Sequence, residues 1–158
     1  MLRASLPASI QIIEQIEEVP PVFGDEGELH QVVINLMTNA AQAIGGAAGR
    51  ITVNIWSAAE PPISLHMRDV GPVVCLSIAD TGCGMDEATL NRVFEPFFTT
   101  KEVGDGTGLG LSVVHGIVNG HGGTITVRSS LGEGSEFTLS LRAIDQHQRT
   151  AQVETVAA

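Results

Sequence analysis

Basic side chains are scarce in this sequence. One lysine and seven arginines accompany 18 acidic residues, which gives a formal net charge of -10. A protein that binds nucleic acid usually gathers lysine and arginine into a patch or stripe that neutralises several phosphates. No stretch of this chain does so, and nucleic acid is therefore not an expected partner.

Cysteine and long apolar runs are also scarce. The two cysteines, Cys75 and Cys83, match neither a disulfide framework nor a paired metal-ligand spacing, so both are expected to be reduced. Apolar runs stop well short of the roughly 18 residues that a membrane-spanning helix needs, and the first residues lack the pattern of a signal peptide. These absences predict a soluble, cytoplasmic domain without membrane contact of its own. They leave open a membrane anchor elsewhere in a longer protein.

What is present fits one compact α/β domain, because 158 residues with 43% hydrophobic content allow a single core. Periodicity and glycine or proline breaks predict strands over 9–16, 50–56, 73–79, 124–129 and 135–141, and helices over 26–44, 86–93 and 109–118. The stretch 94–108 has no sustained period and is predicted to be a lid. A flexible tail is predicted over 143–158.

The helix over 26–44 carries Gln31, Asn35 and Asn39 at a spacing of four, which places the three amides on one helix face. A solvated helix surface would explain any one of them. Asparagine is a mediocre helix former, however, so two of them in mid-helix suggest a task. An amide oxygen offered to a hard cation already held by phosphates fits that task, and Mg²⁺ is such a cation.

A second candidate is the segment Asp80-Thr81-Gly82-Cys83-Gly84, which follows a predicted buried strand. Such a run of letters is often only a turn. At the edge of a sheet, however, a carboxylate can accept a hydrogen bond from an exocyclic amine, and glycines let the backbone close over a flat base. The segment therefore suggests an adenine pocket.

The segment from Phe94 to Lys101 holds three of the five phenylalanines and ends in the only lysine of the chain. One interpretation is a hydrophobic plug that anchors a loop. A single ammonium group beside a glycine-rich loop is also well suited to contact phosphate. Lys101 is thus a candidate phosphate contact, with Arg92 as a second cation nearby.

The run from Gly104 to Leu111 alternates glycine with other residues and leads directly into the last predicted helix. A flexible hinge is one interpretation. The other is an anion cradle, formed by free backbone N–H groups together with the positive end of the helix. The letters match neither a dinucleotide-binding fingerprint nor the Gly-Lys-Ser/Thr of a Walker loop, so both of those phosphate loops are excluded.

Taken in order, these four segments resemble the N, first-glycine, F and second-glycine boxes of bacterial sensor histidine kinases. The resemblance spans residues 20–142 and includes the His-Gly-Gly-Thr-Ile run that begins at His121 and the hairpin over 132–137. It implies a two-layer α/β sandwich of the Bergerat type, a mixed sheet with helices on one face, over a catalytic domain at 9–142. It also implies an ATP site of the kind shared with type II topoisomerases and mismatch-repair ATPases.

The resemblance implies roles for individual residues. Asn39 would ligate Mg²⁺, Asn35 would support the phosphates, and Asp80 would contact the adenine amine. Asn35, Asn39 and Lys101 would be the catalytic residues. The residues that hold ATP would be Asn39, Asp80, Gly82, Gly84, Lys101, Gly106, Thr107, Gly108, Leu109 and Gly110, and Ser135 would hold a water near the base. One departure is Gln42, where many members carry a lysine that reaches the phosphates; the Ala-Gln-Ala-Ile variant resembles the nitrogen-regulation branch.

Phosphoryl transfer fits this sequence better than ATP hydrolysis. In the hydrolytic relatives a glutamate four residues before the magnesium asparagine activates water, whereas Asn35 occupies that position here. An amide cannot act as a general base. A kinase needs no base for water, because its nucleophile is an imidazole nitrogen delivered by another domain.

The resemblance also predicts partners outside this chain. None of the five histidines is followed by the acidic residue, basic residue and proline of the family's acceptor motif. The acceptor is therefore expected on a missing helical dimerisation domain, with the full-length kinase a homodimer that passes its phosphoryl group to a response regulator. Leu2–Pro7 resembles the linker after that domain, which predicts a residual linker over 1–8 and a chain trimmed from a longer protein.

Two other functions remain open at this point. A degenerate domain of this kind would bind nucleotide or a partner protein without chemistry. An anti-sigma-type kinase shares the expected fold but phosphorylates a protein serine instead of a histidine.

Overall fold

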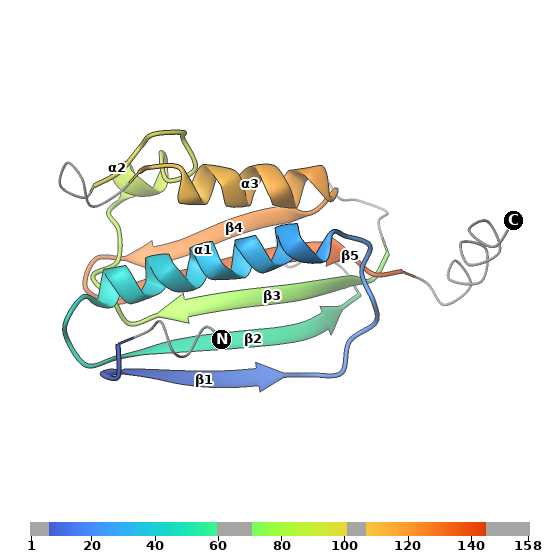
Figure 1. Ribbon diagram of the computed structural model, residues 1–158, viewed down its shortest axis with the longest axis horizontal. Coiled ribbons are helices and arrows are strands. Elements are labelled where there is room, and N and C mark those ends of the chain that lie inside the picture. The colour runs from blue at the N-terminus through green and yellow to red at the C-terminus, as the bar shows by residue number, and fades with distance from the viewer. Residues whose placement is uncertain (1–6, 60–70, 101–106, 145–158) are drawn as a thin grey trace, which may run out of the picture.

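The computed structural model describes residues 7–59, 71–100 and 107–144. Within them, five strands form one mixed sheet in the order β1-β2-β3-β5-β4 (Figure 1). The strands are β1 Ile10–Ile16, β2 Gly49–Ala58, β3 Val73–Asp80, β4 Thr124–Ser130 and β5 Gly134–Arg142. β1 and β2 run parallel, whereas all other neighbours are antiparallel.

Two longer helices, α1 Glu26–Ile44 and α3 Gly110–Gly120, lie side by side on one face of the sheet (Figure 1). α1 begins after Asp25, whose carboxylate accepts a 2.9 Å hydrogen bond from the backbone N–H of Glu28. Such a cap satisfies one of the free N–H groups at a helix start. α1 ends at Gly45, whose φ of 67° is a conformation that glycine adopts without strain.

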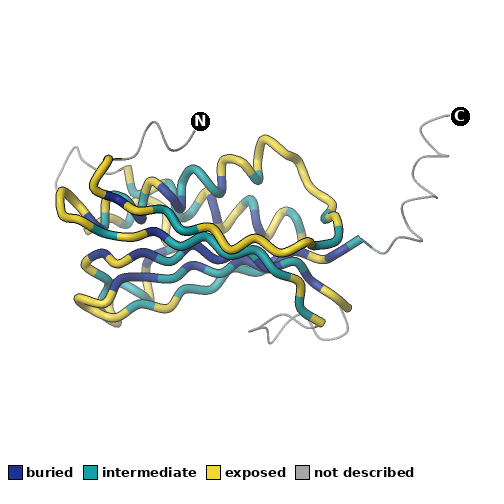
Figure 2. Tube along the Cα trace, turned by 90° about the horizontal axis from the view of Figure 1, so that it is seen from below, coloured by how far each residue is buried: buried dark blue, intermediate teal, exposed yellow. Residues whose placement is uncertain are grey.

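The main core lies between the sheet and the two helices (Figure 2). The apolar side chains of α1 recur at helical spacing, and those of the central strands at alternate positions, so both faces meet in one layer. Its most buried members are Val32, Leu36, Ile51, Ile78, Val114 and Val118. The predicted two-layer α/β sandwich with helices on one face is confirmed.

The predicted elements agree closely with the observed ones, with one exception. The helix over 86–93 is wrong in its extent, because only α2 Glu87–Leu90 is helical. The chain then turns, with the backbone N–H of Glu95 bonded to the Arg92 carbonyl, instead of continuing the helix. No helix in the described part of the chain is long and apolar enough to span a membrane.

At the two termini only part of the predicted boundaries can be compared. Ala143 pairs with Val22 in a β-bridge, and Ile144 donates a backbone hydrogen bond of 2.8 Å to the Pro21 carbonyl. The rest of the predicted tail, most of the predicted linker and residues 101–106 of the predicted lid lie outside the described residues. These boundaries therefore stay predictions.

Candidate functional site

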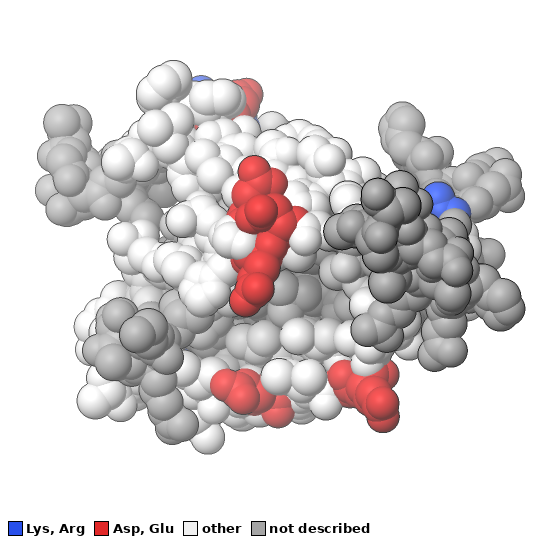
Figure 3. Space-filling model, turned by 45° about the vertical axis from the view of Figure 1, so that its right-hand side comes forward, with Lys and Arg blue, Asp and Glu red and all other residues white. Residues whose placement is uncertain are grey.

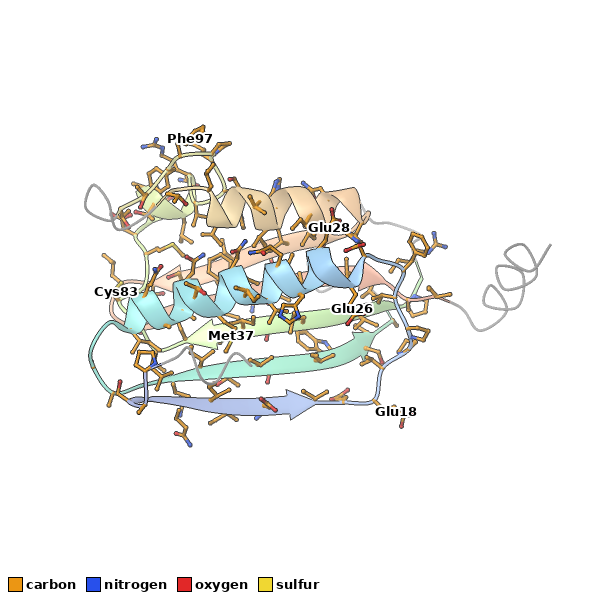
Figure 4. All side chains as sticks on the ribbon, in the orientation of Figure 1. Glu18, Glu26, Glu28, Met37, Cys83 and Phe97 are labelled. Atoms are coloured by element: carbon orange, nitrogen blue, oxygen red, sulfur yellow. The ribbon has the colours of Figure 1, made fainter. Side chains whose placement is uncertain are left out.

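Three segments predicted to act together meet at one end of the sheet, where α1 ends at Ile44, β3 ends at Asp80 and α3 begins at Gly110 (Figure 1). We call this the near end, and the opposite end, where α1 begins and α3 finishes, the far end. Cys83 and Phe97 lie at the near end, and Glu26 and Glu28 at the far end (Figure 4).

Asp80 is a buried carboxylate at the near end, with 8% of its surface exposed. It accepts a hydrogen bond of 2.7 Å from the backbone N–H of Gly82 and another from the backbone N–H of Ser135. Burial raises the pKa of Asp80, and these two hydrogen bonds partly offset the shift. The carboxylate is thus oriented by the backbone and remains an acceptor for a donor group on a ligand.

The glycines after Asp80 allow the loop to pass between α1 and the β4–β5 hairpin. The backbone N–H of Cys83 donates a 3.0 Å hydrogen bond to the carbonyl of Ala43 at the end of α1. A Cβ on Gly82 would lie 2.5 Å from the Ala43 carbonyl carbon, and one on Gly84, whose φ is 66°, would overlap the Ser130 carbonyl. Only glycine fits these two positions, so the pocket wall is built from backbone.

The predicted amide face of α1 points at the first turn of α3. The Asn35 amide nitrogen donates a 3.3 Å hydrogen bond to the carbonyl of Gly110, and the Gln31 amide nitrogen donates a 3.0 Å bond to the Asn35 oxygen. Asn39 is close by, because its amide nitrogen would lie 3.8 Å from a Cβ placed on Gly110. The three amides that the sequence places on one face are therefore brought to the glycine-rich start of α3.

The described parts of the predicted lid are joined to each other. Phe97, which has a φ of 66°, donates a backbone hydrogen bond of 2.9 Å to the Gly108 carbonyl. A Cβ on Gly108, whose φ is 64°, would lie 2.5 Å from the Phe97 carbonyl carbon. The Phe segment and the glycine loop thus form one backbone unit, in which only glycine fits at position 108.

The phenylalanines of this segment have different environments. Phe94 packs against the rings of His115 and Phe137, with centroids 5.2 Å and 6.3 Å away, as the plug interpretation predicts. Phe97 is 75% exposed. Arg92, predicted as a second cation near the phosphates, instead pairs with Glu95 at 2.9 Å and covers the Phe98 ring at 4.4 Å.

The start of α3 is shaped by short side-chain bonds. The Thr107 hydroxyl accepts a 3.3 Å hydrogen bond from the backbone N–H of Leu109, and the Ser112 hydroxyl donates a 2.9 Å bond to the Leu109 carbonyl. The structure therefore brings Asn35, Asn39, Gly108 and Gly110 into one neighbourhood. Lys101 and Gly106 lie outside the described residues.

Sequence reasoning missed one residue of this end, Ser129. Its hydroxyl accepts a 2.8 Å hydrogen bond from the backbone N–H of Met85, donates a 2.8 Å bond to the Gly134 carbonyl and lies 2.9 Å from the Ser135 hydroxyl. It thus fastens the loop after Asp80 to the β4–β5 hairpin. Alternation along β4 places Ser129 on the same face as Val127, which was the available signal.

A metal at this site would depend on oxygen ligands. Among the described residues, no group of three or more histidine, cysteine, aspartate or glutamate side chains is placed to hold an ion. The Asn39 amide, beside the start of α3, supplies a neutral oxygen, the ligand type that Mg²⁺ accepts when phosphates provide the charge. The donor set therefore fits a magnesium ion carried in with a nucleotide.

Comparison with known proteins agrees with this geometry. Residues 24–144 match the family model described as histidine kinase-, DNA gyrase B- and HSP90-like ATPase. Sensor kinase CckA of Brucella abortus (strain 2308) is 40% identical over 149 residues, which cover 92% of this chain and 16% of that protein. Sensor histidine kinase ZraS of Escherichia coli (strain K12) is 42% identical over 125 residues, covering 79% of this chain and 24% of that protein. The chain thus spans less than a quarter of the length of these relatives.

Solved structures give the same result. The mycobacterial sensor histidine kinase MprB superposes with a TM-score of 0.66 at 27% identity, covering 87% of this chain and 85% of that one. Full-length ShkA in complex with AMPPNP gives a TM-score of 0.67 at 31% identity, covering 85% of this chain and 26% of that one. The chain therefore belongs to the histidine kinase-, DNA gyrase B- and HSP90-like ATPase family, and it has the α/β fold of histidine kinase catalytic domains.

Proposed function

We propose that this chain binds Mg-ATP at the near end and transfers the γ-phosphoryl group to a histidine on a separate helical domain. The observation that carries the proposal is that a buried acceptor, Asp80, and the amide face of α1 beside the start of α3 lie at the same end of the sheet (Figure 1). Membership of the ATPase family and its histidine kinase relatives support ATP as the substrate.

Asp80 would recognise the base. Its carboxylate would accept a hydrogen bond from the exocyclic amine of adenine, while the backbone N–H groups of Gly82 and Ser135 hold it in place. The backbone wall at Gly82 and Gly84 leaves room for a flat ring but none for a side chain. Ser135 would hold a water beside the base, as the resemblance implies.

The other half of the site would hold the phosphates. Asn39 would supply an oxygen to Mg²⁺, which when bound neutralises and orients the phosphate oxygens. The backbone N–H groups of Thr107, Gly108 and Gly110, at the positive end of α3, would cradle the phosphates. The Leu109 N–H would join them by exchanging its 3.3 Å bond to the Thr107 hydroxyl for a phosphate oxygen. Lys101 and Gly106 are proposed to complete the lid on the basis of the sequence alone.

Transfer would end on an acceptor outside this chain. An imidazole nitrogen of the helical domain would form the new P–N bond as the P–O bond to ADP breaks, and ADP would leave. Asn35 cannot activate water, because an amide is no general base, and both ends of that amide already bond within the protein. The helical domain would make the parent protein a homodimer, and a response regulator would receive the phosphoryl group.

The test compares phosphoryl transfer by wild type and Asn39→Ala with γ-labelled ATP, Mg²⁺ and the helical domain of the parent protein. We expect wild type to produce acid-labile phosphohistidine and Asn39→Ala to lose at least about a hundredfold in rate, since one well-placed electrostatic group contributes that much. Thr38→Ala, at an exposed neighbouring position of α1, is the matched control and should transfer normally.

Three outcomes would contradict the proposal in different ways. Full transfer by Asn39→Ala would exclude a magnesium role for that residue. Acid-stable phosphoserine on the partner would indicate a serine kinase. No heat of Mg-ATP binding by calorimetry would indicate a degenerate module.

A further inference from the structure

The hydrogen bonds around Asn35 have only one possible polarity. The Gly110 carbonyl can only accept, so the atom of Asn35 that faces it at 3.3 Å must be the amide nitrogen. The Asn35 oxygen then faces Gln31 at 3.0 Å, so the atom that Gln31 presents must be its own nitrogen. A backbone carbonyl of α3 thus fixes the orientation of two successive amides on α1.

Gln31 is exposed, so packing against the core does not explain its side chain. Its amide nitrogen is directed along the helix to the Asn35 oxygen, four residues later. If the Asn35 amide rotated by half a turn, its oxygen would face the Gly110 oxygen and the bond between the helices would become a repulsion. In the observed state the Gln31 nitrogen satisfies the Asn35 oxygen that points away from Gly110, which stabilises the orientation that joins the two helices.

We propose that Gln31 is a positioning residue of the nucleotide site, which holds the Asn35 amide in the one orientation that ties the first turn of α3 to α1. The inference rests on the proposed function. Gly110 follows Thr107, Gly108 and Leu109, whose N–H groups would face the phosphates, and it lies beside Asn39. The tie therefore sets the separation between the magnesium asparagine and the phosphate cradle.

Two substitutions distinguish this positioning role from a general contribution of the Gln31 side chain to the helix surface. Gln31→Glu replaces the donor by a group that only accepts, so it would attract the Asn35 nitrogen and turn the Asn35 oxygen toward Gly110. Gln31→Met keeps the length of the side chain but removes the hydrogen-bond donor, and it offers no acceptor that would turn the Asn35 amide. Thr38→Glu adds the same charge at another exposed position of α1 and serves as the control.

The experiment measures the affinity of each variant for Mg-ATP by calorimetry and for adenosine by nuclear magnetic resonance titration. Adenosine has a base but no phosphates, so it reports the Asp80 pocket alone. We expect Gln31→Glu to weaken Mg-ATP binding about tenfold, the cost of one misoriented, partly buried polar group, and Gln31→Met to weaken it about threefold. Adenosine affinity should not change, and Thr38→Glu should match wild type for both compounds.

A double-mutant cycle tests the path through Asn35. In an Asn35→Ala background, Gln31→Glu should have no further effect on Mg-ATP affinity, because the amide that it would reorient is absent. Three results would each overturn the inference. Gln31→Glu could bind Mg-ATP as tightly as wild type, it could lose as much affinity for adenosine as for Mg-ATP, or its effect could add to that of Asn35→Ala in the cycle. These results leave the proposed function intact, whereas failure of wild type to bind Mg-ATP removes both.

Discussion

The two ends of the α1–α3 helix pair are each closed by a polar side chain, but in different ways. At the far end His121 is almost fully buried; its Nε2 accepts a 3.0 Å hydrogen bond from the backbone N–H of Asp25, and its Nδ1 donates one of 2.8 Å to the Ile117 carbonyl. At the near end the Asn35 amide bonds to Gly110 from a partly exposed position. At the far end both nitrogens of the His121 ring are hydrogen-bonded within the protein. At the near end the two helices are joined by amides that lie beside the proposed ligand.

Charge also distinguishes the two ends. Figure 3 brings the far end forward and shows acidic side chains gathered on that face. Asp25, Glu26 and Glu28 belong to the start of α1, where negative charge stabilises the positive end of a helix. The same charges would repel a triphosphate, which is a further reason to place the nucleotide at the near end.

This difference between the two ends predicts that one end of the helix pair contributes mainly to stability and the other mainly to ligand binding. Residues of the far end should change the free energy of unfolding without changing nucleotide affinity. Residues of the near end should do the reverse, unless they form the backbone wall of the pocket or, like Asp80, carry a buried carboxylate.

The largest effect is expected from Gly84→Ala, which breaks that wall. A Cβ at this position would overlap the Ser130 carbonyl, and its φ of 66° disfavours any side chain. We expect a loss of about 3 kcal/mol in the free energy of unfolding, measured by urea denaturation, together with loss of Mg-ATP binding. Gly46→Ala, where the added Cβ meets nothing within 4 Å, is the control and should stay within about 0.5 kcal/mol. Normal ATP binding by Gly84→Ala would contradict this account of the pocket wall.

The second prediction concerns the far end. His121→Ala removes two hydrogen bonds and leaves a cavity beside Gly24, where a Cβ would lie 2.8 Å from the His121 ring. We expect a loss of about 2 kcal/mol in the free energy of unfolding and a Mg-ATP affinity within twofold of wild type, roughly the error of such measurements. His115→Ala removes an exposed histidine of α3 that contacts only the Phe94 ring among the ring contacts described above, and it should cost less stability than His121→Ala. A tenfold loss of affinity in His121→Ala would show that the two ends are coupled.

Local patterns allowed much of the fold to be predicted from the sequence. The capping pair at Asp25 and Glu28 and the stop at Gly45 define α1 at the bounds observed. The turn between β4 and β5 was likewise predicted from its glycines, and the observed pairing of Ser130 with Gly134 closes that hairpin. These signals lie within a few residues of what they determine.

Pairings between distant residues could not be predicted in the same way. The contact of Asn35 with Gly110 joins positions 75 residues apart, and the sheet order places β5 between β3 and β4. Neither leaves a local pattern. The resemblance to histidine kinases supplied the grouping of the four segments, while the roles of their residues stay predictions.

The third prediction is a pH dependence at the near end. Burial raises the pKa of Asp80 in the folded state, so the folded protein holds this proton to higher pH than the unfolded chain does. The contribution of Asp80 to stability therefore falls as pH rises from its unfolded pKa through its raised folded pKa, and then stays constant. Asp80→Asn lacks this decline, so the stability of the variant relative to wild type should rise over that window.

Urea denaturation of both proteins over a pH series isolates this effect, because all other carboxyl groups titrate alike in the two. Mg-ATP affinity of wild type should increase over the same window, since the ionised carboxylate is the better acceptor. If the stability of Asp80→Asn relative to wild type stays constant or falls as pH rises, the pH-dependent loss of stability does not come from Asp80.

The smallest effect is expected from Arg92→Ala. Arg92 and Glu95 are more than half exposed, and pairs of this kind contribute little; the contact with the Phe98 ring at 4.4 Å adds a similar amount. We expect a change within about 0.5 kcal/mol in the free energy of unfolding. Because the guanidinium group is directed to Glu95 and Phe98, Mg-ATP affinity should also change less than about twofold.

Arg142→Ala provides the matched control, because it removes the same charge from the exposed end of β5, which lies away from the pocket. If Arg92 instead contacts phosphate when the nucleotide is bound, Arg92→Ala would lose about tenfold in Mg-ATP affinity, as loss of a charge-assisted hydrogen bond predicts, and Arg142→Ala would not. That result would extend the near end to include the turn after α2. Equal, small effects in the two variants would confine phosphate binding to α1, the glycine loop and the first turn of α3.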